Sequence, residues 1–245
     1  MDNIVSPNDY SATWFEVFLE SIQPIQTESE IEFLVRNLPN PPYLKILDLC
    51  CGLGRHSLGL ANKGYQVTGM DINETVLEKA RKYSGESVEY LNQDMRKLDQ
   101  LQISFDVVVN LWQSFGYFDD VVNENIFKQI GRILSPKGRL IMDIYHRSFF
   151  ELHQGSRQFE KDGLVITESK VMNGNRLTID LEYENQGTDR FIWRLYTPDE
   201  INEIAVNSGF RSLVTCTGFN ENTPPTPNNP RMQIVFEKTE NRTPL

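Results

Sequence analysis

An aspartate and two glycines stand close together in the segment LDLCCGLGRH, residues 47–56. Asp48 lies in an apolar run, Gly52 and Gly54 follow it, and a helical pattern begins at Arg55. Because glycine has no side chain, a ligand can touch the backbone of such a turn. The first turn of the following helix offers unpaired N–H groups, which favour a carboxylate or a phosphate. The segment therefore predicts a ligand-binding turn between a strand and a helix.

Two more acids end the strands that follow this turn. Asp71 ends the second predicted strand, where its carboxylate can accept both hydroxyls of a ribose. Asp94 ends the third, within LNQDM, where an adenine amino group would find an acceptor. A glycine turn followed by an acid fits either NAD or S-adenosylmethionine. Three details favour the second: the NAD fingerprint does not require Asp48, Ser57 replaces its third glycine, and Asp94 provides a further acid.

The glycine turn and the acids can lie together if they follow parallel strands that alternate with helices. The sequence shows this pattern from residue 45 onward. Short strands are predicted over residues 45–49, 66–72, 88–92, 105–111 and 139–145. Helical patterns lie between them, over residues 55–63, 75–83 and 126–134. The repetition predicts an α/β fold, in which a parallel sheet carries helices on both faces. The carboxyl ends of the strands would gather the turn and the acids at one edge.

The segments before the repeat are predicted to be helical. Residues 9–22 show an apolar helical face that includes Trp14. A T-x-x-E capping box at Thr27 and Glu30 predicts a second helix over residues 28–38.

The segment after residue 150 shows the pattern of an antiparallel sheet. Four strands are predicted, over residues 157–161, 164–172, 176–184 and 190–195. The Asp-Gly and Asn-Gly turns between them are typical of hairpins. A second T-x-x-E box, at Thr197 and Glu200, then starts a helix that returns the chain to the α/β repeat. The last two strands are predicted over residues 212–217 and 232–237.

We therefore predict four parts of the chain. They are an N-terminal helical cap (1–44), a ligand-binding core (45–150), an antiparallel β insertion (151–196) and the C-terminal part of the core (197–245). The insertion could form a roof over a substrate or a contact between two copies, so both a monomer and a homodimer remain open.

Composition narrows the classes of partner. Lys and Arg number 24 and Asp and Glu 34, so the 245-residue chain carries a net charge of −10, which argues against a nucleic-acid partner. No apolar run reaches the roughly 20 residues of a membrane span, and the first residues do not resemble a signal peptide. The three cysteines Cys50, Cys51 and Cys216 lack metal-binding spacing. We expect no metal and a cytoplasmic location.

Several segments together resemble the class I S-adenosylmethionine-dependent methyltransferases, of the bacterial small-molecule type. Residues 47–73 resemble their motifs I and II, and NQDM resembles the adenine-binding motif after the third strand. FDVVVNLWQSFGYF resembles the fourth-strand motif, ILSPKGRLIMDIY the turn before strand five, and WRLYTPDEINEIAVNSGF a late helix entry. The resemblance implies a Rossmann-like, seven-stranded, mostly parallel sheet with helices on both faces, a small antiparallel β insertion and an N-terminal helical lid.

The resemblance also implies residues around the cofactor S-adenosylmethionine. They are Asp48, Cys50, Gly52, Gly54, Asp71, Ile72, Asp94, Met95, Asn110 and Leu111. Asp48 would lie near the ammonium group, Asp71 at the ribose and Asp94 at the adenine edge. One departure is Cys50, which stands where the family often has its first glycine.

The acceptor side is predicted from residues that follow strands four and five. Tyr145 and His146 are the candidate catalytic residues; the alternative for His146 is a helix-capping or surface histidine. The candidate substrate-binding residues are Trp14, Gln113, Tyr117 and Tyr196. Aromatic faces attract cations, so such a pocket could receive an amine. His56, in contrast, is expected to face solvent.

These observations predict a methyltransferase that moves a methyl group to N or O of a small molecule and leaves S-adenosylhomocysteine. Two alternatives stay open. One is an NAD(P)-dependent oxidoreductase on the same sheet, and the other is a non-catalytic protein that binds S-adenosylmethionine.

Overall fold

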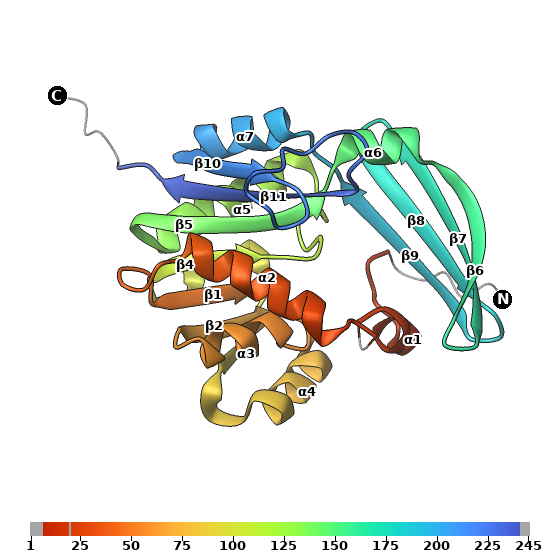
Figure 1. Ribbon diagram of the computed structural model, residues 1–245, viewed down its shortest axis with the longest axis horizontal. Helices are drawn as coiled ribbons and strands as arrows, with labels where there is room; N and C mark the ends of the chain where they lie inside the picture. The colour runs from red at the N-terminus through yellow and green to blue at the C-terminus, as the bar shows by residue number, and fades with distance from the viewer. Residues whose placement is uncertain (1–6, 20, 241–245) are drawn as a thin grey trace.

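The seven-stranded sheet predicted from the sequence forms the centre of the molecule. The computed structural model describes residues 7–19 and 21–240 of the chain. The strands are β1 (Lys45–Leu49), β2 (Gln66–Asp71), β3 (Glu89–Asn92), β4 (Phe105–Asn110), β5 (Leu134–Tyr145), β10 (Phe210–Cys216) and β11 (Arg231–Lys238). Their order is β10-β11-β5-β4-β1-β2-β3 (Figure 1). Strands β1 to β5 pair in parallel, and β11 and β10 join them antiparallel, which confirms a mostly parallel sheet.

The order of the strands reverses beside β1. From β1 the chain proceeds outward to β2 and β3 and then returns to β4 on the other side of β1. Asp48 is consequently in register with Gly69 of β2 and with Val109 of β4. Ligands of open α/β sheets bind at such a reversal, beyond the carboxyl ends of the strands. The topology therefore directs attention to the end of β1.

Helices cover both faces of the sheet. The helices are α2 (Pro24–Asn37), α3 (Arg55–Asn62), α4 (Glu74–Ser84), α5 (Asp120–Ile133), α6 (Arg147–Leu152) and α7 (Pro198–Asn207), with short 3₁₀ turns η2 (Gly85–Ser87) and η3 (Met95–Gln100). Buried side chains of α2, α3 and α4, such as Leu34 and Leu60, belong to one core cluster. Those of α5 and α7, such as Phe127 and Ile201, belong to another. The two clusters show the layers of an α/β sandwich.

Helix α2 begins one turn earlier than its sequence predicts. Its N-cap is Gln23 and its first residue is Pro24, whose fixed φ suits the first turn of a helix. Thr27 lies inside the helix, and its hydroxyl accepts a hydrogen bond from Arg55 instead of capping. The prediction of a capping box at Thr27 and Glu30 is therefore wrong. The box predicted at Thr197 is present, with both reciprocal hydrogen bonds formed.

The N-terminal segment is less helical than predicted. A single turn, α1 (Ala12–Trp14), runs into a short π-helix, η1 (Phe15–Leu19). The hydroxyl of Ser11 caps α1 by accepting the N–H of Trp14. Residue 20, within the helix predicted over residues 9–22, lies outside the described residues, as do residues 1–6 of the predicted cap.

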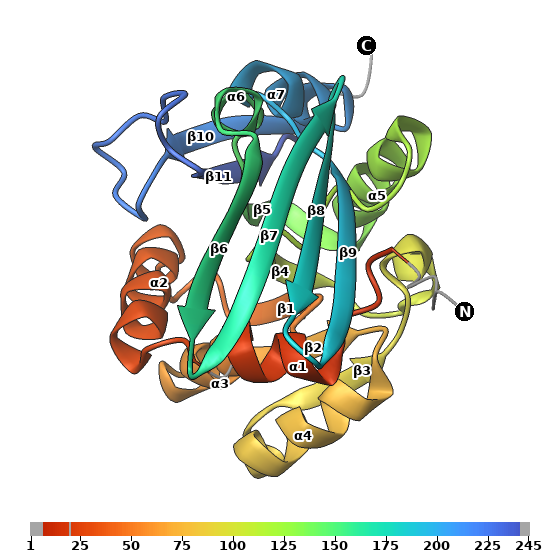
Figure 2. The same ribbon diagram turned by 90° about the vertical axis from the view of Figure 1, so that its right-hand side faces the viewer.

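The insertion forms a separate antiparallel sheet. Its strands are β6 (Gly155–Lys161), β7 (Leu164–Asn173), β8 (Arg176–Tyr183) and β9 (Gly187–Arg194), in the order β6-β7-β8-β9. The sheet stands across one end of the core, with α1 beside it (Figures 1 and 2). Its buried face, which includes Phe191 and Trp193, packs in a third cluster together with Val17 of the N-terminal segment. No helix within residues 7–19 and 21–240 is long and apolar enough to cross a membrane.

Candidate functional site

A cavity of about 920 Å³ lies between the core and the antiparallel sheet. Its lining comes from the N-terminal segment, from the turns after β1, β2 and β4, from the end of β5, and from β7, β8 and β9. The parallel strands therefore open into it at their carboxyl ends, as the topology requires. Within the described residues, no group of acids, histidines or cysteines is arranged to hold a metal ion.

The turn after β1 has an unusual backbone. Cys50, Gly52 and Gly54 all have positive φ, at 62°, 56° and 76°. A Cβ on Gly54 would lie 2.2 Å from the hydroxyl of Tyr90, so only glycine fits there. A Cβ on Gly52 would meet nothing closer than Leu19 at 3.9 Å, so its backbone faces open space. Cys50 thus keeps the left-handed conformation that a glycine would adopt, and both Cys50 and Gly52 line the cavity.

Asp48 is a buried carboxylate at the cavity wall. The hydroxyl of Ser57 donates to it over 2.6 Å. Burial raises the pKa of Asp48, while His56, Ser57 and Arg55 act in the opposite direction. Ser57, noticed in the sequence only as a missing glycine, orients this acid. The arrangement can accept a cationic group such as an ammonium.

Asp71 joins the first two turns. One carboxylate oxygen accepts the N–H of Gly52 at 3.0 Å, and the other accepts that of Asn73 at 2.9 Å. Burial raises the pKa of Asp71. The next residue, Ile72, is exposed and offers an apolar surface within the same cavity. A hydrogen-bonding acid beside an apolar side chain suits a ribose that carries a flat base.

Asp94 lies near the end of β3 but outside the cavity lining, as does Met95. The carboxylate of Asp94 is paired with Arg96, whose Nε lies 3.0 and 2.9 Å from its two oxygens, and this hydrogen bond lowers the pKa of Asp94. Arg96 itself lines the cavity and stacks over Phe118. To bind the adenine as predicted, Asp94 would therefore have to use its backbone, or its ion pair with Arg96 would have to break.

Asn110 ties the ends of β4 and β1 together. It is buried, and its Nδ2 donates to the carbonyls of Leu49 at 3.0 Å and Ser114 at 3.2 Å. It does not line the cavity, whereas Leu111 does. Asn110 therefore holds the ends of β4 and β1 together, and of these two residues only Leu111 lines the cavity.

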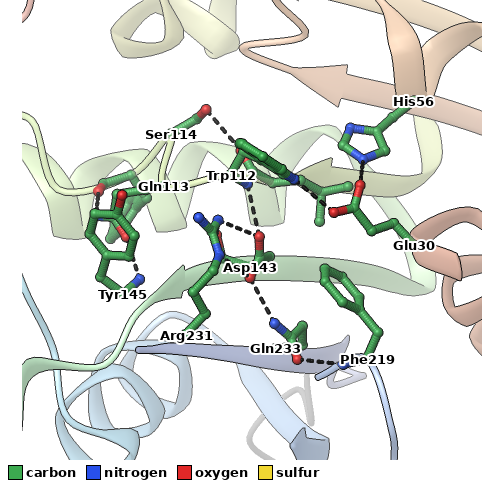
Figure 3. A network of polar contacts seen from close by, with 12 residues as sticks. Glu30, His56, Trp112, Gln113, Ser114, Asp143, Tyr145, Phe219, Arg231 and Gln233 are labelled. Carbon is green, nitrogen blue, oxygen red and sulfur yellow. Dashed lines mark hydrogen bonds and ion pairs between the residues drawn. The ribbon is translucent and has the colours of Figure 1, made fainter. Parts of the chain in front are cut away.

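Asp143 is the centre of a polar network beneath the cavity (Figure 3). It is fully buried and accepts hydrogen bonds from Arg231 Nε at 3.0 Å, Gln233 Nε2 at 2.8 Å and the N–H of Trp112 at 3.1 Å. Arg231 lines the cavity, with its guanidinium over the rings of Trp112 and Tyr145. The sequence analysis missed this network. The one sign of this network in the sequence was an acid, Asp143, within the buried strand LIMDIY.

The same network holds Trp112 and Gln113 in left-handed backbone conformations, with φ of 60° and 59°. Gln113 accepts the N–H of Tyr145 through Oε1 and donates to the carbonyl of Phe115 over 2.9 Å. The predicted substrate residue Gln113 therefore lines the cavity while its side-chain amide fastens the end of β5.

Glu30 of α2 links that helix to the site. Its carboxylate accepts His56 Nε2 at 2.7 Å, Trp112 Nε1 at 2.9 Å and Arg55. Burial opposes ionisation of Glu30, but His56 and Arg55 lower its pKa to about 2. His56 is thus buried and lines the cavity, so the expectation that it faces solvent is wrong.

Arg55 keeps an unused donor at the cavity wall. Its Nη2 is buried and has no partner, while its guanidinium stacks over the ring of Trp112 at 4.6 Å. A buried donor without an acceptor costs about 1–3 kcal/mol. Close to Asp48, which can take an ammonium, the guanidinium of Arg55 supplies a positive charge that suits the carboxylate of an amino-acid moiety. These residues therefore fit the methionine part of S-adenosylmethionine.

Aromatic side chains form the part of the cavity under the antiparallel sheet. Tyr117 and Trp14 line it, as predicted from the sequence, and so does Tyr145. The hydroxyl of Tyr10 lies 2.8 Å from that of Tyr117. Burial raises the pKa of Tyr145, so its hydroxyl stays protonated at neutral pH.

His146 and Tyr196 do not reach the cavity. Successive side chains of a strand point to opposite sides, so with Tyr145 at the cavity His146 faces away. His146 is buried and is the N-cap residue of α6, and burial lowers its pKa. Tyr196 is buried in the core and packs against Phe115. The structure therefore does not support contact of either residue with a substrate.

The N-terminal segment is fastened to β9. Asn8 exchanges hydrogen bonds with the backbone of Ile192 at 3.1 and 2.9 Å and donates its N–H to Arg190. Asp189, which is buried, accepts the N–H of Ser11 at 3.1 Å and its hydroxyl at 2.7 Å. The segment that carries Tyr10 and Trp14 to the cavity is thus held by the antiparallel sheet.

We expect the substitution Asp189→Asn to loosen this segment. Hydrogen bonds to a charged group contribute roughly 1.5–3 kcal/mol, and a loss of about 2 kcal/mol raises the opened population about 30-fold. Limited proteolysis should therefore cut within residues 7–19 faster in the variant. Asp180→Asn is the control, because among the described residues Asp180 pairs only with the exposed Arg190 on the same sheet. Equal cleavage in the two variants would contradict the role of Asp189.

Comparisons with known proteins agree with this geometry. A family model described as "Methyltransferase domain" matches residues 46–138. YqeM of Bacillus subtilis (strain 168), which its name places among the methyltransferases, is 30% identical over 197 residues, covering 74% of this chain and 78% of YqeM. A glycine/sarcosine N-methyltransferase of Aphanothece halophytica is 24% identical, and the match covers 86% of this chain and 85% of that protein.

Among solved structures, an S-adenosylmethionine-dependent methyltransferase from Clostridium acetobutylicum ATCC 824 superposes with a TM-score of 0.76. It is 17% identical, and the match covers 93% of this chain and 97% of that one, so it shares the fold. The glycine turn and the acids Asp48 and Asp71 line a cavity at the carboxyl ends of the parallel strands, where open α/β sheets bind ligands. On the extent of the match to YqeM, the chain belongs to the class I S-adenosylmethionine-dependent methyltransferases.

Proposed function

We propose that this protein transfers the methyl group of S-adenosylmethionine to N or O of a small molecule held under the antiparallel sheet. The observation that carries the proposal is a single cavity that runs from the turns at Asp48 and Asp71 to the aromatic side chains of the insertion. One space of this size can hold both ligands in contact and exclude water.

The donor side of the cavity would be occupied by the cofactor, whose sulfonium supplies an activated methyl group. Asp48 would hold its ammonium, Arg55 would face its carboxylate and Asp71 would hold its ribose. Ile72 would pack beside the adenine, and the backbone at Gly52 would approach the methionine part. In this proposal the protein mainly aligns two bound molecules, and alignment supplies about 7–11 kcal/mol in favourable cases.

On the acceptor side, Trp14, Tyr117 and Tyr145 would surround the small molecule. Because its hydroxyl stays protonated, Tyr145 would orient the acceptor as a hydrogen-bond donor, not remove a proton. The glycine/sarcosine N-methyltransferase among the relatives supports a nitrogen acceptor. We also propose a cytoplasmic location, since the thiol of Cys50 at the donor site would be kept reduced there.

Two experiments test the proposal. Melting temperatures measured with S-adenosylmethionine, S-adenosylhomocysteine, NAD and NADP should rise with the first two only, because a ligand at 100 times its Kd stabilises by about 2.7 kcal/mol. Labelled donor should then transfer its methyl group to a component of a small-molecule extract. Binding of the donor without any transfer would favour a non-catalytic protein.

The buried acids predict how cofactor affinity depends on pH. The pKa of Asp48 is raised, so on acidification it takes up a proton before an ordinary aspartate would and loses its attraction for the ammonium. Asp48→Asn should weaken binding of S-adenosylhomocysteine about 10- to 100-fold at neutral pH, by loss of one charged hydrogen bond. Calorimetry should show that the affinity of the unchanged protein and that of Asp48→Asn become more similar as the pH falls.

The stability of the unliganded protein provides the control for this variant. An aspartate with a raised pKa stabilises the fold most when protonated, and this contribution is lost as the pH rises through the raised pKa. Asp48→Asn should therefore not lower the melting temperature at neutral pH. A constant affinity ratio across the acidic range would argue against Asp48 as the ammonium ligand.

A further inference from the structure

Glu168 is a charged residue on the otherwise apolar wall of the cavity. It lies on β7, opposite Arg157 of β6 and Leu181 of β8. Among the described residues, five from the antiparallel sheet line the cavity, and Glu168 alone of them carries a charge; the others are Ile179, Leu181, Phe191 and Trp193. The sequence analysis did not single it out, and the donor site does not use it.

One oxygen of Glu168 is occupied and the other is free. Arg157 Nε, at 2.5 Å, and Lys170 Nζ, at 2.7 Å, both contact Oε2. Within the described part of the chain Oε1 makes no hydrogen bond, and it is not one of the buried atoms that lack a partner, so it keeps accessible surface. Glu168 lines the cavity, and Oε1 is the oxygen of its carboxylate that Arg157 and Lys170 leave without a hydrogen bond.

The surroundings of this oxygen favour a nitrogen group that carries N–H donors. Arg157 and Lys170 occupy Oε2, and the remaining oxygen, beside apolar side chains, gains most from a ligand that can donate a hydrogen bond to it. The aromatic rings of Trp193, Phe191 and Tyr145 line the same space, and ring faces attract the methylated ammonium that transfer to an amine produces. An alcohol would gain nothing from the rings in this way.

Proton chemistry points in the same direction. An alcohol acceptor needs a base to remove its proton during transfer, whereas a neutral amine already carries a reactive lone pair. Tyr145 stays protonated, so its hydroxyl is not a suitable base for an alcohol. His146 faces away from the cavity.

We infer that the methyl acceptor is a small primary or secondary amine, and that Glu168 Oε1 binds its N–H. The inference rests on the proposed function and specifies its acceptor. The nitrogen lone pair forms the bond to the methyl carbon as the carbon–sulfur bond breaks, and sulfur keeps that electron pair. The product is a methylated ammonium, which pairs with Glu168 until it leaves and gives up its extra proton to water.

Binding is tested first, in the complex with S-adenosylhomocysteine. The probes are benzylamine and benzyl alcohol, which differ only in the group that Glu168 would recognise. Benzylamine should raise the melting temperature of this complex more than the alcohol does, and Glu168→Gln should abolish the difference. The matched control is Glu182→Gln, on the exposed side of the same sheet. Equal shifts, no shift, or an undiminished difference in Glu168→Gln would each overturn the inference.

Transfer is tested next, with labelled donor and a small-molecule extract. Mass spectrometry should find the new methyl group on nitrogen, and Glu168→Gln should raise KM for that amine at least tenfold while the Kd of S-adenosylhomocysteine stays unchanged. Only O-methylated products, or an unchanged KM, would overturn the role of Glu168 and leave the proposed methyl transfer intact. No product at all, with the donor still bound, would overturn the proposed function and this inference with it.

Discussion

Replacement of Asp71 by alanine should weaken the binding of S-adenosylhomocysteine by about 100-fold or more, the largest loss expected from any single cofactor contact. Hydrogen bonds to a charged group contribute roughly 1.5–3 kcal/mol each, and the ribose would lose two of them. The substitution also removes the acceptor of the Gly52 N–H and so releases the turn after β1. Titration calorimetry with S-adenosylhomocysteine measures the effect directly.

The control for this prediction is Glu74→Gln. Glu74 also lines the cavity close to Asp71, but it is paired with the exposed Arg81. It should change the affinity by less than about fivefold, since exposed ion pairs contribute 1 kcal/mol or less. If Asp71→Ala bound the ligand as tightly as Glu74→Gln, the ribose would have to lie elsewhere.

The second large effect concerns stability. Asp143→Ala should lower the free energy of unfolding by about 3–5 kcal/mol, because it removes a fully buried carboxylate and leaves the partly buried guanidinium of Arg231 without its partner. For a chain of this size this corresponds to roughly 6–20 °C in melting temperature. The N–H of Trp112 and the amide of Gln233 would lose their acceptor too. Thermal unfolding followed by circular dichroism is the measurement.

A double substitution separates the charge from the packing. Asp143→Asn with Arg231→Met removes both charges of the pair and should recover part of the stability that either change costs alone. Such coupling is expected for residues in direct contact. Strictly additive effects would show that the two side chains do not stabilise each other, and a shift below about 2 °C for Asp143→Ala would contradict the buried pair itself.

Two identical sequence patterns fold differently, which shows the limit of predicting structure from a local pattern. T-x-x-E occurs at Thr27 and at Thr197, and only the second forms a capping box. At the first, Pro24 starts the helix one turn earlier, and Glu30 turns to Arg55 and His56. The neighbouring prolines differ, since Pro24 precedes Thr27 whereas Pro198 follows Thr197. The competing partners of Glu30 lie about 25 residues away and leave no local signal.

The acceptor side shows a similar limit. Tyr145 and His146 are neighbours, and both were reasonable candidates after the fifth strand. The alternation of the strand places one at the cavity and the other behind it. Which of the two faces the cavity depends on the register of β5 against β4 and β11.

The order of strands and helices, the glycine turn, and the acids at the ends of β1 and β2 could be read from contiguous residues. Each of these features depends on backbone conformations and spacings within about 25 positions, so the local pattern suffices. The pairing of Asp143 with Arg231 spans 88 positions, and the approach of Glu168 to the cavity depends on a separate sheet. Such contacts arise only when distant strands find their register, because a buried charge gains its partner through packing and not through proximity along the chain.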